Sequence, residues 1–265
     1  MNVFLFELRQ LRRSTIIWTL ALMGAVVFLM SMFPAFSRDV DAFAKLLAGF
    51  PEAVKKALGI NIEAIGSLLG YYAYIFTYIT LVGAIQAMTL GVSLVSKETR
   101  DKTADFLLTK PISRSRIITA KLVAALISML IVAAGYLAAA SAMAYLVSSA
   151  AFSYGVFFMI SITLLFVQLV FFALGVLVSV LAKKIRAVLS VSLGTVFTFF
   201  IINLLSLASG DDKLRYLTPF QYFDPAQIRQ TSSYESTFVL LSAVFTVAAI
   251  VASYVLYKKK DIHAV

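Results

Sequence analysis

The sequence predicts an all-α polytopic membrane protein with six transmembrane helices, an N-terminal interfacial helix and a cytoplasmic helix between spans two and three, all in one domain (1–265). Of the 265 residues, 61% are hydrophobic and 14% are charged, whereas a soluble domain is about 45–50% apolar and about 25% charged. The apolar residues form six runs long enough to cross a bilayer, which takes about 20 helical residues. The runs lack the alternation of barrel strands. They cover residues 15–35, 72–95, 118–147, 155–182, 187–208 and 237–257.

Six spans place both termini on one side of the membrane, and the basic residues indicate which side. Sixteen of the 23 lysines and arginines fall on the side of the termini, and seven fall on the other side. Basic residues favour the cytoplasmic side, so we expect a multi-pass protein of the cell membrane with both termini in the cytoplasm. Because these charges flank spans instead of lining one soluble face, no nucleic-acid partner is expected.

Several kinds of site are excluded by residues that the chain lacks. It has no cysteine, and its single histidine, His263, lies in the C-terminal tail, so no metal site is expected. No span offers paired carboxylates or a nucleophile–base set, which argues against an intramembrane enzyme. The sequence has no Gly-Lys dipeptide and therefore no phosphate-binding loop. If ATP drives this protein, another chain binds the nucleotide.

The N-terminal residues 1–14 have the pattern of a short amphipathic helix. Phe4, Leu8 and Leu11 recur at helical spacing, while Glu7 and three arginines supply polar positions. Such a helix lies in the plane of the membrane interface. The alternative is a simple extension of the first span, with arginines that reach toward the headgroups.

The first extracellular segment, residues 36–70, is expected to contain short surface helices. Pro51 suits the first turn of one of them, and Gly59 suits its C-terminal stop. These helices either cap a pathway from outside or cover the neighbouring spans.

The second extracellular segment, residues 209–236, is rich in aromatic residues. Aromatic side chains with a polar edge suit the membrane interface, and Pro219 and Pro225 fix turns. The expected interfacial anchors are Tyr216, Phe220, Tyr222 and Phe223.

Within the spans, the strongest polar groups are three amides, Gln86, Gln168 and Asn203. Each either bonds a neighbouring helix or contacts cargo, so these are the candidate pathway residues. The absence of charge deep in the spans argues against a proton-coupled carrier or a voltage sensor. Residues 133–144 of the third span are mostly small, which predicts close helix packing, either internally or at a dimer face.

The polar connection between spans two and three holds seven of the 23 basic residues, between Lys97 and Lys121. Lys110-Pro111 breaks a helix, and Ser113 suits the N-cap of the next one. Residues 96–117 therefore predict a helix, a proline turn and a second helix entering the membrane. Arg114 and Arg116 fall in a first turn, where the helix dipole disfavours cations. Lipid phosphates or an acidic partner would favour them.

A loop that only orients the protein needs its basic residues, but it needs no apolar group. Here Phe106, Leu107 and Leu108 end the first predicted helix of the connection. An apolar group beside charges is what a helix uses when it binds in a partner's groove. The connection is therefore also a candidate docking surface for a soluble partner.

The stretch KETRDKTADFLLTKPISRSRIITAKL resembles the cytoplasmic loop of permease subunits of type-2 ABC exporters. That pattern has a Glu, a Gly-Thr pair, a Leu-Leu pair, a Pro, Ser-Arg, and a Lys as the third span begins. Lys102 stands where the family has glycine. The overall layout, with LTPFQYF before the sixth span, is also similar. The matching positions are Glu98, Thr103, Leu107, Leu108, Pro111, Ser113, Arg114 and Lys121.

The resemblance implies that this loop is a coupling helix seated in a cleft of an ATP-binding subunit. Glu98, Thr103, Pro111 and Arg114 would belong to the contact, and Phe106 to Leu108 would fill the groove. Two ATP-binding subunits would carry ATP and Mg²⁺, and this chain would bind no cofactor. A second permease chain, identical or related, would complete the pathway within the membrane lipid.

The resulting hypothesis is the transmembrane subunit of an ATP-driven exporter of an amphipathic compound, such as a drug, a peptide antibiotic or a lipid-like cargo. The alternative is a non-transporting membrane anchor or sensor subunit for a soluble partner. The two differ in what a change at Phe106, Leu107 and Leu108 would do. It would uncouple ATP hydrolysis from transport in the first case, and only release the partner in the second.

Overall fold

The computed structural model describes residues 3–40, 45, 49–59, 62–100, 113–148, 150–182 and 185–259. Within these residues every regular element is a helix, there are no strands, and six helices are long and apolar enough to cross a membrane. This confirms the predicted all-α fold with six spans. The spans are α1 (Val3–Ser31), α6 (Leu68–Arg100), α8 (Arg114–Val147), α9 (Tyr154–Leu181), α10 (Val188–Ser209) and α13 (Ser236–Lys259).

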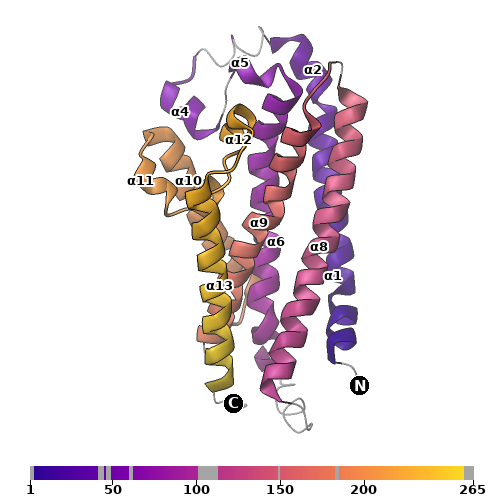
Figure 1. Ribbon diagram of the computed structural model, residues 1–265, viewed down its shortest axis with the longest axis vertical. Helices are drawn as coiled ribbons and strands as arrows, with labels where there is room; N and C mark the ends of the chain where they lie inside the picture. Colours follow the sequence, from indigo (N-terminus) through magenta and orange to yellow (C-terminus); the bar gives the residue numbers. More distant parts are fainter. Residues whose placement is uncertain are drawn as a thin grey trace.

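The spans run side by side between two ends of different character (Figure 1). At one end α1 begins, α8 begins and α13 ends, so both chain termini lie there; we call it the terminal end. The opposite end carries the short helices, and we call it the cap end. Its helices are α2 (Phe33–Arg38), α4 (Glu52–Ala57), α5 (Ile62–Ile65), α11 (Asp212–Arg215) and α12 (Pro225–Thr231).

The centre of the molecule is the contact between α6 and α9, which are the two most buried spans. Their backbones touch at Gly91 and Gly175. A Cβ atom added at Gly91 would lie 2.4 Å from the carbonyl oxygen of Phe172, and one added at Gly175 would lie 2.7 Å from that of Met88. Because lipid supplies no hydrophobic drive between helices, such close backbone packing is a main source of their association.

A second pair of spans, α1 and α8, packs along its length. Gly135 lies against Thr19, since an added Cβ would come within 2.6 Å of the Thr19 Cγ2 atom. Thr15 and Ser128 share a buried hydrogen bond of 2.6 Å between their hydroxyls. Gly135 and Ser128 of α8 thus pack against α1 inside this chain, whereas Ala134, Ala138 and Ala142 of the same helix are exposed.

The structure corrects the expectation of a separate interfacial helix at residues 1–14. Helix α1 is continuous from Val3 to Ser31, so these residues are the first turns of the first span. No proline or glycine interrupts the helix before Gly24, and Thr15 Oγ1 donates to the Leu11 carbonyl across the expected boundary. An ion pair between Glu7 and Lys121 also holds this part of α1 against α8.

The expected short helix between Pro51 and Gly59 is present as α4. Pro51 is its N-cap residue, one position earlier than expected. Gly59 follows the C-cap with a φ of +68°, the left-handed conformation that glycine adopts without strain.

The segment predicted to be the second extracellular one, residues 209–236, is more deeply packed than its aromatic residues indicated. A short 3₁₀ helix, η1 (Pro219–Gln221), turns Phe220 inward. Its ring centroid lies 5.1 Å from that of Phe171 and 5.5 Å from that of Phe200. Phe223 is also buried. These two residues are therefore core residues and not interfacial anchors, whereas Tyr216 is exposed, as an anchor must be.

Candidate functional site

The predicted coupling segment is described only at its two edges. Glu98 belongs to the last turn of α6, and Arg114 begins α8. Five of the predicted contact residues lie outside the described residues, namely Thr103, Phe106, Leu107, Leu108 and Pro111. The structure therefore shows how α6 ends before this segment and how α8 begins after it.

The entry into α8 is built as the sequence indicated. Ser113 has extended backbone angles, and its hydroxyl accepts a hydrogen bond from the Arg116 amide at 3.4 Å, which confirms the predicted N-cap. Arg114 Nη1 donates to the Lys258 carbonyl at 3.4 Å. That carbonyl is at the C-terminal end of α13, where the helix dipole favours a cation. The end of α13 thus offsets the unfavourable position of Arg114 on its own helix.

Helices α8 and α13 are joined again one turn further into the bundle. The Tyr254 hydroxyl donates to the Ser115 carbonyl at 3.4 Å and shares a hydrogen bond of 3.3 Å with Thr119 Oγ1. Lys258 Nζ lies 4.9 Å from the centroid of the Tyr254 ring, a cation–π geometry. These contacts connect the start of α8 to the C-terminal helix.

A buried ion pair connects the same part of α8 to α1. Lys121 Nζ lies 2.9 Å from Glu7 Oε1, and the side chains are only 6% and 9% exposed. Lys121 matches the family lysine at the start of the third span, but its partner was not predicted. The available signal was a single carboxylate among the arginines of residues 2–13. Helix α8 is therefore tied to both α1 and α13 at the terminal end.

The candidate pathway residues fall into two places. Gln168 Nε2 donates to Gln86 Oε1 at 2.9 Å, and both side chains are buried between α9 and α6. Asn203 instead accepts a hydrogen bond of 2.7 Å from Gln221 Nε2. The structure thus brings Gln86 and Gln168 together and pairs Asn203 with a residue that sequence reasoning did not single out.

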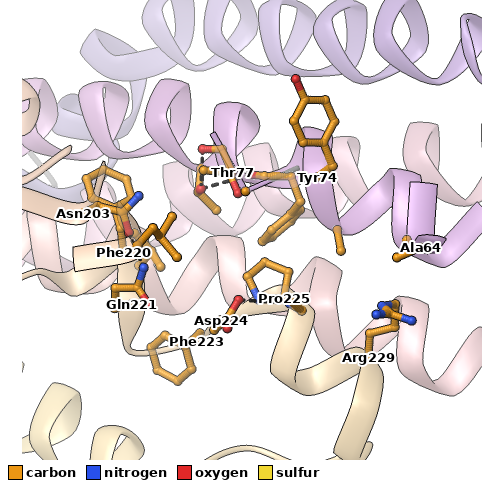
Figure 2. Close-up of a pocket in the computed structure, with 18 of the residues that line it drawn as sticks. Ala64, Tyr74, Thr77, Asn203, Phe220, Gln221, Phe223, Asp224, Pro225 and Arg229 are labelled. Atoms are coloured by element: carbon orange, nitrogen blue, oxygen red, sulfur yellow. Dashed lines mark hydrogen bonds between the residues drawn. The ribbon is translucent and has the colours of Figure 1, made fainter. Parts of the chain in front are cut away.

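Asn203 and Gln221 line a cavity of about 110 Å³ at the cap end. Figure 2 shows them beside Phe220 at one side of this cavity, with Arg229 at the other. Thr77 and Tyr74 of α6 form a further wall. Amide and hydroxyl groups beside aromatic rings can bind a molecule that has both polar and apolar parts.

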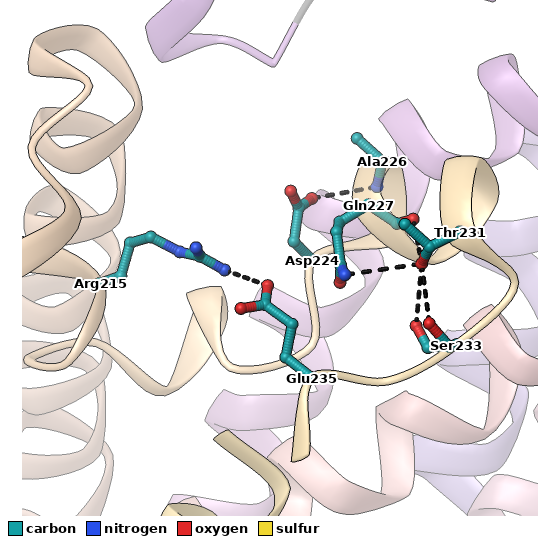
Figure 3. A network of polar contacts seen from close by, with 7 residues as sticks. All are labelled: Arg215, Asp224, Ala226, Gln227, Thr231, Ser233 and Glu235. Atoms are coloured by element: carbon teal, nitrogen blue, oxygen red, sulfur yellow. Dashed lines mark hydrogen bonds and ion pairs between the residues drawn. The ribbon is translucent and has the colours of Figure 1, made fainter. Parts of the chain in front are cut away.

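Polar contacts hold the cap-end segment that carries this cavity in place (Figure 3). Arg215 forms an ion pair with Glu235, which ties α11 to the start of α13. Asp224 caps α12 by accepting a hydrogen bond of 3.0 Å from the Ala226 amide. Burial raises the pKa of the Asp224 carboxyl, although the Ala226 amide opposes this shift.

We expect Asp224→Asn to be at least as stable as the native protein, and Asp224→Ala to lose about 1 kcal/mol, the usual value of an N-cap. Asparagine keeps the capping oxygen and removes the charge of this half-buried side chain. Because the folded-state pKa of Asp224 is raised, the native protein loses stability relative to Asp224→Asn as the pH rises through that pKa. Thermal unfolding in detergent at about pH 4.5 and about pH 8 measures this difference. If the stability of Asp224→Asn relative to the native protein were larger at the lower pH, the result would contradict this prediction.

The fold and these contacts define a polytopic helical membrane protein whose polar connection between spans two and three enters a helix tied to both the first and the last span. A family model described as "ABC-2 family transporter protein" matches residues 1–262. The chain therefore belongs to the ABC-2 transporter family and is a type-2 ABC permease subunit. No curated protein matches the sequence.

Proposed function

We propose that this chain is the transmembrane subunit of an ATP-driven exporter in the cell membrane, and that it moves an amphipathic compound. Two permease chains, identical or related, would act with two separate ATP-binding subunits that carry ATP and Mg²⁺. Membership of the family supports the role of membrane subunit. The single observation that supports coupling to a partner is the set of contacts that tie the start of α8 to α1 and α13.

The distribution of charge supports a cytoplasmic terminal end. Helices α1, α8 and α13 all carry basic residues at the terminal end, and cytoplasmic segments are enriched in such residues. Glu7, the acidic residue of α1, is neutralised by Lys121. The basic residues of the described helices at this end include Arg9, Arg12 and Arg13 of α1, Arg114 and Arg116 of α8, and Lys258 of α13.

In the proposed mechanism, Phe106, Leu107 and Leu108 fill a groove on the ATP-binding subunit, and Glu98, Thr103, Pro111 and Arg114 flank that contact. Movement of this segment displaces the start of α8. The Glu7–Lys121 ion pair passes the displacement to α1, and the Tyr254 contacts pass it to α13. Coupling of this kind is reciprocal, so bound cargo must change nucleotide affinity by the same factor as nucleotide changes cargo affinity.

The cap-end cavity beside Asn203 is the part of the proposed pathway that the described residues favour. Its apolar wall includes Phe76 and Val167, while Asn203, Gln221 and Thr77 provide hydrogen-bonding groups. This mixture suits an amphipathic cargo, but the cavity of about 110 Å³ must widen to admit one, because ligand pockets measure about 300–1,000 Å³. Gln86 and Gln168 bond each other in this arrangement, so they would contact cargo only after the contact between α6 and α9 opens.

A triple alanine variant of Phe106, Leu107 and Leu108 tests the proposal. We expect the full-length variant to fold but to lose most of the ATP-binding subunit that co-purifies with the native chain, because the groove loses its apolar ligand. The matched control replaces Phe50, Val54 and Leu58, three exposed apolar residues at the cap end, and should retain the subunit. Equal capture by the two variants would contradict the proposed contact.

The same variants separate the exporter from the anchor hypothesis when purified complexes are placed in proteoliposomes. An exporter hydrolyses ATP faster when amphipathic cargo is added, and residual complex of the loop variant should lose this stimulation. An anchor would show cargo-independent hydrolysis in every variant.

A further inference from the structure

A groove at the terminal end carries a cation, Arg116, that neither the fold nor the proposed transport function uses. It measures about 560 Å³ and lies between the start of α1, the start of α8 and the end of α13. Val3, Phe4 and Val123 form an apolar side. The other residues are polar, namely Ser113, Ser115, Arg116, Thr119 and Tyr254, apart from Ala120.

Arg116 is the cation of this groove and differs from its neighbour Arg114. Its side chain is exposed, and its guanidinium has no hydrogen-bond or ion-pair partner among the described residues. It lies in the first turn of α8, where the helix dipole disfavours a positive charge. Arg114 is compensated by the Lys258 carbonyl, but no comparable protein group compensates Arg116 in the part of the chain described.

Hydroxyl groups line the same groove as this guanidinium. The Ser113 oxygen accepts the Arg116 amide hydrogen, so its own proton is available to donate. The Ser115 hydroxyl makes no hydrogen bond among the described residues. Thr119 and Tyr254 are bonded to each other and to the Ser115 carbonyl, so they form a fixed wall. A guanidinium with hydroxyl donors is suited to phosphate oxygens.

The apolar side of the groove continues onto the outer surface of α8. Val123, Leu126 and Leu130 are each exposed by 40% or more and follow one another at helical spacing. An acyl chain can lie along this row while its headgroup is in the groove. Inorganic phosphate or an acidic peptide would leave the row unused.

We propose that this groove binds one anionic phospholipid of the surrounding leaflet, with its phosphate on Arg116 and the Ser113 and Ser115 hydroxyls. The lipid supplies the negative charge that the start of α8 requires and fills the space between α1, α8 and α13. The proposal depends neither on the identity of the cargo nor on the ATP-binding subunit.

Thermal unfolding of the full-length protein in a neutral detergent tests this, with phosphatidylglycerol or phosphatidylcholine added in increasing amounts. We expect phosphatidylglycerol to raise the unfolding temperature of the native protein to a plateau and phosphatidylcholine to have little effect. Arg116→Gln should weaken the apparent affinity for phosphatidylglycerol roughly tenfold or more, the effect of losing a charge-assisted hydrogen bond. Arg116→Lys, which keeps the charge, should weaken it less.

The matched control is Arg12→Gln, which removes the same charge from an exposed arginine of α1 that does not line the groove. It should respond to phosphatidylglycerol like the native protein, and equal losses in the two glutamine variants would overturn a specific site. Inorganic phosphate is the soluble probe. If it gives the same stabilisation and competes fully with the lipid, the groove binds free anions and the proposal is wrong. Loss of the ATP-binding subunit from Arg116→Gln with an intact lipid response would also overturn it, since Arg116 would then be a protein contact.

Discussion

Replacing Lys121 by methionine is expected to destabilise the protein by about 3–5 kcal/mol, the usual cost of removing one partner from a buried ion pair. The Glu7 carboxylate would remain packed between α1 and α8 without its cation, since both side chains are less than 10% exposed. Unfolding of the purified protein by heat or denaturant in detergent measures the loss. The variant should also lose the contact that passes movement of α8 to α1.

The double variant Glu7→Leu/Lys121→Met shows whether the buried charge causes this loss. Replacing both partners by apolar residues of similar size is commonly neutral or stabilising, so the double variant should recover most of the stability. Glu52→Gln is the matched surface control, because the Glu52 side chain, which pairs with Lys55, is 77% exposed and exposed charges contribute little. A double variant as unstable as Lys121→Met would mean that packing or another contact dominates at this position.

Replacing Gly91 by alanine is expected to destabilise the contact between α6 and α9 by about 2–3 kcal/mol, the cost of forcing extra volume into a packed interface. The new Cβ would lie 2.4 Å from the Phe172 carbonyl oxygen and 2.9 Å from the Val176 amide nitrogen. Both are backbone atoms, so one helix must shift. The higher helix propensity of alanine, worth about 1 kcal/mol, offsets only part of this cost.

Gly194→Ala and Gly24→Ala are the controls for this prediction. A Cβ at either position meets nothing within 4 Å, so the propensity gain should appear without strain. Unfolding in detergent should therefore place Gly91→Ala below the native protein and both controls at or slightly above it. Equal stability of all three variants would show that α6 and α9 are not in the close contact described.

The features that could be predicted from sequence are those set by local patterns. The six spans followed from the length of the apolar runs, and the starts of α4 and α8 followed from Pro51 and Ser113. The family motif between Glu98 and Lys121 pointed to the family that the family model then matched. Each of these signals lies within a short stretch of chain.

The features that were missed depend on which faces of distant helices meet. Glu7 and Lys121 are far apart in sequence, so neither reveals the other. The same holds for Gly91 and Gly175, because a single glycine in an apolar run does not show that another backbone approaches it. Phe220 and Phe223 have side chains that suit either a membrane interface or a core, and only the turn at Pro219 decides between them.

The proposed function requires this chain to act as the membrane subunit of an ATP-driven transporter. The most direct test is to purify the full-length chain from its native membrane under mild conditions and determine by native mass spectrometry which proteins accompany it. We expect a complex of two permease chains with two ATP-binding subunits that hydrolyses ATP. Recovery of the intact, folded chain without any ATP-binding subunit would contradict it.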